Sequence, residues 1–195
     1  MKLVISDLGG VVVDKADPVP DMAARLELPV ETFRALTAES TRLLLAGMIT
    51  AQEFWARFFD QTGRRVEEDL WEKEFRPVVN PAVLSLVEKV RRRVRVVAGT
   101  NTMEPHWPAL QKSGVLASFD AVYASHHMGL VKPDPHFYWR ILREEECRPG
   151  EAVFFDDVAE HVRVAREIGM VAFPFRKPED LERRLSSMGL LDGEL

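Results

Sequence analysis

The sequence predicts an α/β fold, in which a parallel sheet carries helices on both faces and a small all-helical segment is inserted after the first strand. Two features lead to this prediction. After about residue 80, short apolar runs alternate with helical patterns, which is typical of a parallel sheet covered on both sides. Between the first apolar run and residue 80, by contrast, the chain shows helical periodicity over roughly 60 residues.

The sheet region is expected to contain five strands and four helices. Pro81 suits a first helical turn after Asn80, and the basic run at 91–93 suits the carbonyl end of the same helix. The expected strands are the apolar runs 3–6, 94–98, 120–124, 152–155 and 171–173, and the later helices are 135–143, 158–168 and 178–188.

The inserted segment is expected to contain helices at 21–26, 30–46, 51–61 and 67–75. Thr50 and Glu53 form a capping box for the third of them. We therefore assign residues 16–79 to a helical domain, and residues 1–15 together with 80–195 to the α/β core. Aromatic residues at helical spacing are expected to form the insert's own core, with a ligand pocket as the alternative: Phe54, Trp55, Phe58, Phe59 and Trp71.

Composition indicates a soluble cytoplasmic enzyme. The 195 residues are 46% hydrophobic, which suffices for one full core and a small accessory domain. A net charge of -5 without a long basic run argues against nucleic acid as the main partner. The single Cys147 excludes an internal disulfide and fits a reducing compartment. No signal peptide is readable after Lys2, and no run approaches the ~20 apolar residues of a membrane span.

The first apolar run delivers a lone carboxylate, Asp7, onto a glycine turn at Gly9 and Gly10. A side chain at the carboxyl end of a parallel strand lies where open α/β sheets bind their ligands. Glycines at this place let backbone groups approach a bound ion or phosphate. Asp7 is therefore the first candidate for a reacting group.

Three later strands also end in residues that carry chemistry. Thr100 and Asn101 offer a hydroxyl, an amide and backbone N–H groups to an anion. Lys132 supplies a cation, and Asp156 with Asp157 forms an adjacent carboxylate pair. Such a pair near Asp7 either raises a pKa or recruits a cation, and oxygen ligands favour a hard ion such as Mg²⁺.

These four segments, in this order, resemble the motifs of the haloacid dehalogenase-like hydrolase superfamily over nearly the whole chain. Asp7 to Val11 resembles the first motif, Thr100–Asn101 the second, Lys132–Pro133 the third and Phe155 to Asp157 the fourth. The resemblance is strongest to small bacterial sugar-phosphate phosphatases of the α-glucose 1-phosphate type. It implies a Rossmann-like core, and it implies that the helical insert is a cap that closes over the active site and selects the substrate.

The sequence departs from this resemblance at Gly9. Most phosphatases of the superfamily have an aspartate there, which protonates the leaving oxygen and later activates water. Glycine has no side chain for this task, which typically contributes roughly 10²–10⁴-fold. The simpler interpretation of His106 and His127 is that each is a surface loop histidine, and the alternative is that one of them supplies the missing proton.

The resemblance implies a Mg²⁺-dependent phosphomonoester hydrolase acting on a small phosphorylated metabolite, most simply a sugar phosphate. Asp7 would form an aspartyl-phosphate while Lys132 and Thr100 hold the reacting groups. The implied substrate ligands are Thr100, Asn101, Lys132 and Gly10, and the implied metal ligands are Asp7, the Gly9 carbonyl, Asp157 and Asp156. The roles of Glu160 and His161 stay open, as does whether Asp156 is a water-mediated ligand or a partner of Lys132.

Two alternatives remain at this stage. Carbon–halogen cleavage without metal would use Asp7 on carbon, but the pair Asp156–Asp157 favours phosphate chemistry. A phospho-ligand-binding protein with weak turnover is supported by Gly9 alone. The sequence predicts neither the substrate nor the oligomeric state.

Overall fold

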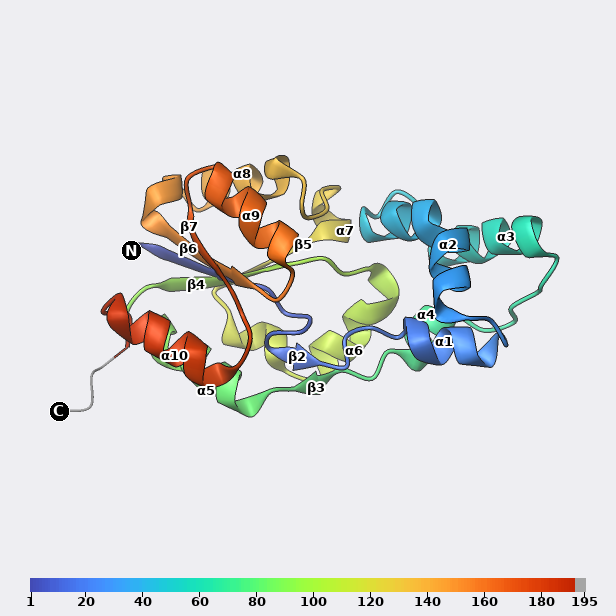
Figure 1. The fold of residues 1–195 in the computed structure, drawn as a ribbon, viewed down its shortest axis with the longest axis horizontal. Coiled ribbons are helices and arrows are strands. Elements are labelled where there is room, and N and C mark those ends of the chain that lie inside the picture. Colours follow the sequence, from blue (N-terminus) through green and yellow to red (C-terminus); the bar gives the residue numbers. More distant parts are fainter. Residues whose placement is uncertain (192–195) are drawn as a thin grey trace.

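The computed structural model describes residues 1–191, and within them a parallel sheet forms the centre of the larger part of the molecule (Figure 1). The strand order across this sheet is β5-β4-β1-β6-β7. The strands are β1 Leu3–Ser6, β4 Arg95–Thr100, β5 Ala121–Ala124, β6 Ala152–Asp156 and β7 Val171–Pro174. The central strand β1 runs parallel to both of its neighbours, so the predicted Rossmann-like α/β fold is confirmed.

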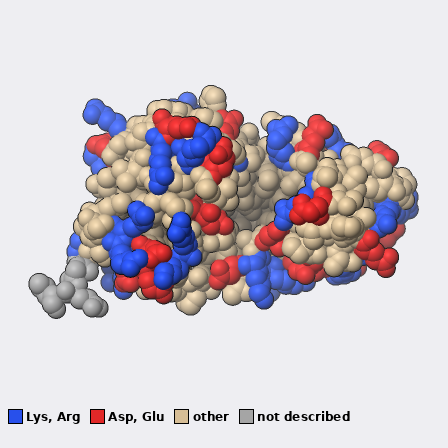
Figure 2. Space-filling view, viewed as in Figure 1, with Lys and Arg blue, Asp and Glu red and all other residues tan. Residues whose placement is uncertain are grey.

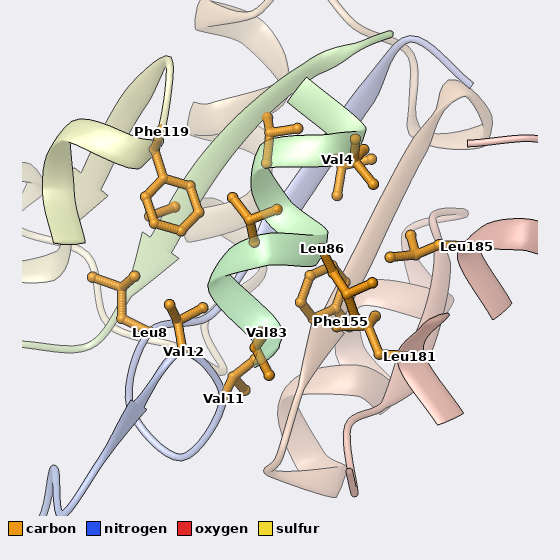
Figure 3. Close-up of a cluster of buried hydrophobic side chains, with 14 of the residues drawn as sticks. Val4, Leu8, Val11, Val12, Val83, Leu86, Phe119, Phe155, Leu181 and Leu185 are labelled. Carbon is orange, nitrogen blue, oxygen red and sulfur yellow. The ribbon is translucent and has the colours of Figure 1, made fainter. Parts of the chain in front are cut away.

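Alternate residues of each strand pack on opposite faces of the sheet. Val4 joins the core beneath α5 Pro81–Arg91 and α10 Pro178–Ser187, where Leu86 and Leu185 contribute side chains (Figure 3). Ile5 joins the core beneath α8 Pro135–Glu144 and α9 Ala159–Glu167 on the other face. The two layers of helices are therefore both required to bury the hydrophobic sheet.

The inserted segment forms its own helical cluster beside the sheet region (Figure 1). Phe54, Trp55, Phe58 and Trp71 are buried in this cluster, whereas Phe59 is exposed, so most of these aromatics pack as expected. The helices are α1 Val19–Arg25, α2 Val30–Leu45, α3 Ala51–Thr62 and α4 Leu70–Glu74. The capping box of Thr50 and Glu53 at the start of α3 is present.

The chain leaves and re-enters the sheet region through a two-stranded antiparallel ribbon, which the sequence did not predict. The strand β2 Val13–Asp14 pairs with β3 Val78–Val79. The sequence also did not predict several short helical elements. They are the 3-10 helices η1 Glu104–His106, η2 Val115–Ser118 and η3 Pro149–Glu151, and the α-helices α6 Trp107–Lys112 and α7 Ser125–Met128. Between residues 1 and 191, no helix has both the length and the apolar character needed to cross a membrane.

Candidate active site

Four loops that follow parallel strands meet at one edge of the sheet. Asp7 follows β1, Thr100 ends β4, Asp156 ends β6, and the chain after β5 passes through α7 to Lys132. Because the strands are parallel, their carboxyl ends share one edge. The structure thus brings the four candidate segments together.

Lys132 connects the segments. Its Nζ lies 2.9 Å from Oδ1 of Asp7, 2.7 Å from Oδ2 of Asp156 and 2.8 Å from the carbonyl oxygen of Gly99. Three acceptors match the three donors of the ammonium group, so this buried cation is fully partnered. Burial lowers the pKa of Lys132, but Asp7 and Asp156 outweigh it and hold the pKa above its usual value. The site therefore contains a fixed positive charge at neutral pH.

Asn101 positions the backbone of Lys132. Its side-chain nitrogen donates to the Lys132 carbonyl oxygen at 2.9 Å, and its side-chain oxygen accepts the Lys132 N–H at 2.8 Å. Nζ of Lys132 lies over the rings of Phe137 and Phe154, 5.8 and 5.6 Å from their centroids, within the range of cation–π attraction. The Asn101 side chain, expected on the phosphoryl group, is thus engaged in holding the lysine segment.

The Asp7 carboxylate is buried and oriented by its neighbours. The N–H of Leu8 donates to Oδ1 at 2.7 Å, and Asp7 donates its own N–H to the Phe155 carbonyl oxygen at 3.1 Å. Burial raises the pKa of Asp7 to about 6; Lys132 opposes this rise and the charge of Asp156 adds to it. Oδ1 is fixed by Leu8 and Lys132, so the orientation of the whole carboxylate is defined.

Asp156 is fully buried and held by three groups. In addition to Lys132, Nδ1 of His161 lies 2.9 Å from Oδ2, and the N–H of Val158 donates to Oδ1 at 2.8 Å. The hydroxyl of Tyr138 donates to the His161 carbonyl oxygen at 3.0 Å. Against the effect of burial, Lys132 and His161 hold the pKa of Asp156 well below its usual range. Of the two roles considered for Asp156, the ion pair with Lys132 is the one seen here.

Asp157 lies on the glycine turn after β1. A Cβ built on Gly10 would lie 2.2 Å from Oδ2 of Asp157, and Gly10 has φ +71°. Burial, followed by the charge of Asp156, raises the pKa of Asp157. The N–H of Gly10 donates to the Val13 carbonyl oxygen at 2.9 Å and is already engaged. The expected role of Gly10 as a substrate ligand is therefore revised: it provides space for Asp157.

The donor set fits a hard divalent cation. Asp7, Asp156 and Asp157 each offer a carboxylate oxygen, and these atoms lie within 4.8 Å of one another. Burial and the Asp156 charge raise the pKa values of Asp7 and Asp157, and a bound cation would oppose this rise because its charge favours the ionised carboxylates. Oxygen ligands of this kind suit Mg²⁺.

Gly9 lies where the resemblance implies an aspartate. A Cβ on Gly9 would be 3.1 Å from the Cβ of Ala16, which is tighter than an ordinary packing contact. Gly9, Thr100 and His106 line a cavity of about 30 Å³, which has room for a water molecule. Within the described part of the chain, the lining of this cavity contains no carboxylate.

The interpretation of His106 as a surface residue is wrong. It is buried, and its ring stacks on Phe75 with centroids 3.9 Å apart. Burial, with a smaller effect of His126, lowers the pKa of His106 to about 3, so the imidazole is neutral at pH 7 and is not an imidazolium acid. His127 is exposed as interpreted. Glu160 is exposed and pairs with Arg163 at 2.6 Å.

The haloacid dehalogenase-like hydrolase family model matches residues 1–169 of the chain. This chain belongs to the haloacid dehalogenase-like hydrolases. The predicted superfamily and the prediction of a hydrolase are confirmed, whereas the α-glucose 1-phosphate branch stays a prediction.

Several curated relatives of this hydrolase are named as phosphatases. D-ribitol-5-phosphate phosphatase of Bacteroides thetaiotaomicron is 22% identical over 200 residues, covering 95% of this chain and 97% of the relative. Phosphatase MT3486 of Mycobacterium tuberculosis is 31% identical over 121 residues, covering 58% and 56%. Drimenol cyclase drtB of Aspergillus calidoustus is 29% identical over 105 residues, 53% of this chain, and the chain spans only 20% of that relative's length.

Solved structures of the family share the fold. A family enzyme from Bacteroides thetaiotaomicron superposes with a TM-score of 0.80 at 22% identity, covering 95% of this chain and 98% of that one. An Asp-to-Ala mutant of that enzyme, in complex with magnesium and inorganic phosphate, has a TM-score of 0.72 at 22% identity and covers 90% and 94%. The L-2-haloacid dehalogenase from Xanthobacter autotrophicus has a TM-score of 0.65 at 17% identity and covers 98% and 85%.

Several contacts of the hydrolase site were not predicted. His161 binds Asp156, and Ser125 accepts the Thr102 N–H at 3.0 Å while donating to the Thr102 carbonyl oxygen at 2.8 Å. His161 follows Asp156 by five residues, one turn into α9, and this spacing was the available signal. The contact between Ser125 and Thr102 joins the ends of two strands and has no local sequence signal.

Proposed function

We propose that this hydrolase is a Mg²⁺-dependent phosphomonoesterase that acts on a small phosphorylated metabolite, most simply a sugar phosphate, with Asp7 as the nucleophile. The observation that carries the proposal is the buried Lys132, held between Asp7 and Asp156. A carboxylate beside a fixed cation can accept a phosphoryl group, because the cation offsets the negative charge that develops. Relatives named as phosphatases support this reaction class.

The reaction would proceed in two displacements. A carboxylate oxygen of Asp7 bonds to phosphorus, the ester P–O bond breaks, and the leaving oxygen takes a proton from water. A second water then attacks phosphorus and gives a proton to the hydroxide left by the first water, and the P–O bond to Asp7 breaks, which releases inorganic phosphate and restores the Asp7 carboxylate. The charge of Lys132 offsets the negative charge of the phosphoryl group through the transfer. Thr100 donates its hydroxyl, and Asn101 donates its backbone N–H because its side chain holds Lys132.

The cluster of Asp7, Asp156 and Asp157 supports Mg²⁺ as the cofactor. Asp7, Asp157 and the carbonyl oxygen of Gly9 would hold Mg²⁺. Asp156 is paired with Lys132 and would contact the ion only through an intervening water. When bound, the ion offsets charge on the transferring group. The magnesium and phosphate complex of the Bacteroides enzyme supports this assignment.

We also propose that residues 16–79, with helices α1–α4, are the cap that selects the substrate, and that residues 1–15 and 80–195 are the catalytic core. The surface is hollowed between these two parts, with acidic side chains on both margins (Figure 2). A pocket of about 560 Å³ between them is lined by residues of both, including Met48 and Pro105. None of Asp7, Thr100 and Lys132 lines this pocket, so it supports a division into two parts rather than a position for the substrate.

Phosphate release from sugar phosphates, nucleotides and p-nitrophenyl phosphate, with Mg²⁺ or with a chelator, tests the proposal. Wild-type protein should release phosphate only with Mg²⁺, Asp7→Asn should release none, and Asp21→Asn, which alters an exposed aspartate of α1, should match wild type. Halide release from 2-haloacids without metal would instead favour the dehalogenase. Mg²⁺-dependent binding of sugar phosphates without hydrolysis would favour the binding protein that Gly9 alone supports.

A further inference from the structure

A second group of potential metal ligands lies outside the site of Asp7. His126 and His127 of α7 and Glu104 of η1 each offer one ligand atom, all within 4.8 Å of one another. Oε2 of Glu104 lies 3.3 Å from Nε2 of His126 and 3.9 Å from Nε2 of His127. Tetrahedral ligands around Zn²⁺ lie about 3.4 Å apart at the usual bond lengths, so small side-chain adjustments would suffice.

The imidazole of His126 lacks the partners that a buried polar ring normally has. Its side chain is only 3% exposed. Among residues 1–191, neither of its ring nitrogens has a partner with hydrogen-bond geometry, although Nε2 lies 3.3 Å from Oε2 of Glu104. Buried polar atoms of native proteins are almost always partnered, so an atom without a partner indicates a missing ligand.

An ion pair between His126 and Glu104 does not explain the cluster. Nε2 of His126 and Oε2 of Glu104 are 3.3 Å apart, but the contact lacks hydrogen-bond geometry. The Glu104 side chain is 74% exposed, so packing does not force it against the histidines. Neutral imidazole and carboxylate are, however, the forms in which both residue types bind metals.

The surroundings hold α7 in place and leave the cluster accessible. A Cβ on Gly47, which follows α2, would be 2.2 Å from the carbonyl oxygen of His126, so the two segments touch closely. Figure 1 shows α7 between the sheet and α2. Glu104, His126 and His127 also line the 560 Å³ pocket, which gives an ion a path from solvent.

We propose that Glu104, His126 and His127 form a binding site for a divalent transition-metal ion of the zinc class, with a fourth coordination position open to the pocket. Two imidazoles and one carboxylate are a common donor set for Zn²⁺, and imidazole favours such ions over Mg²⁺. The site shares no residue with the proposed Mg²⁺ site. Its existence therefore does not depend on the proposed phosphatase activity.

Calorimetric titration of metal-free protein with Zn²⁺ tests the site, with excess Mg²⁺ present to occupy the carboxylates near Asp7. Wild-type protein should bind one Zn²⁺ per chain. Glu104→Gln and His127→Ala alter exposed side chains and should each weaken Zn²⁺ affinity at least tenfold without changing the unfolding temperature of the metal-free protein. His136→Ala, at another exposed histidine, and Asp157→Asn should keep wild-type affinity.

Trp107 gives an independent spectroscopic readout. Its ring lies 5.4 Å from that of His126 and 4.8 Å from that of His127, between centroids. Cu²⁺ bound at the site should quench the Trp107 fluorescence, and Zn²⁺ should reverse the quenching. In Trp107→Phe the Cu²⁺-quenched fluorescence should be absent, while one Zn²⁺ per chain still binds. Wild-type affinity in both Glu104→Gln and His127→Ala, loss of binding in Asp157→Asn, or no Zn²⁺ binding by wild type would overturn the proposal.

Discussion

Gly10 lies so close to Asp157 that a Cβ on the glycine would be 2.2 Å from Oδ2 of the carboxylate. No heavy-atom contact of that length is tolerated, and the φ of +71° at Gly10 also favours glycine. The contact joins the turn after β1 to the acidic pair after β6. Gly10 therefore contributes to the proposed metal site by leaving space for one of its ligands.

Gly10→Ala should abolish Mg²⁺-dependent activity because the new methyl group displaces Asp157. Gly63→Ala is the matched control, since Gly63 has φ +70° and a Cβ placed on it would have no atom within 4 Å. Both variants should lose about 1 kcal/mol from left-handed backbone strain. Urea unfolding and the Mg²⁺ dependence of turnover separate the two effects. Equal activity in both variants would show that Asp157 needs no such space.

Lys132→Ala should be inactive and strongly destabilised. It leaves Asp7 and Asp156 buried without their shared cation, a change that typically costs roughly 3–5 kcal/mol. Lys112→Ala, at an exposed lysine, is the control and should unfold like wild type. Chemical denaturation without Mg²⁺ measures the difference. A loss of stability below about 1 kcal/mol would contradict the central position of Lys132.

Asp7→Asn should stabilise the metal-free protein at neutral pH. Folding raises the pKa of Asp7 from 3.8 to about 6, so the stability that this group contributes is complete below pH 3.8 and is lost as the pH rises through 6. Above pH 6 the penalty is on the order of 3 kcal/mol, and asparagine avoids it. Unfolding curves at pH 4 and pH 8, with Asp21→Asn as control, measure the effect. If Asp7→Asn stabilised the metal-free protein more at pH 4 than at pH 8, this prediction would be contradicted.

Gly9 should make the rate depend steeply on the leaving group. Without a positioned acid, p-nitrophenyl phosphate and anomeric sugar 1-phosphates should react ~10²-fold faster than phosphates of primary alcohols. Gly9→Asp combined with Ala16→Gly, which removes the methyl 3.1 Å from the new Cβ, should reduce this ratio. Ala16→Gly alone is the control. Similar wild-type rates for all leaving groups would indicate that another acid operates.

The sheet was predictable because its strands are continuous apolar runs. The β1 prediction, Leu3–Ser6, matches the structure, and β4 extends further than expected, to Thr100, because Gly99 and Thr100 also pair with β5. The ribbon of β2 and β3 was missed because its two-residue strands depend on partners about 65 residues apart. Short strands of this kind have no periodicity to detect.

The positions of Asp7 and Asp156 could be predicted because each residue lies at the carboxyl end of a strand that the sequence itself indicates. A residue's role was not predictable where it depends on a distant segment. His106 is buried because Phe75 of the insert stacks on its ring, and Asn101 is engaged because Lys132 is 31 residues further along the chain. Such contacts are determined by tertiary packing, which a single sequence does not reveal.

The most direct test of the account is acid quenching of the enzyme during turnover of a sugar phosphate, followed by mass spectrometry of the peptide that contains Asp7. The account predicts one phosphoryl group on Asp7 in the presence of Mg²⁺, and none after chelation or in Asp7→Asn. Phosphate release that continues in Asp7→Asn, or turnover by wild type with the phosphoryl group on another residue, would contradict it.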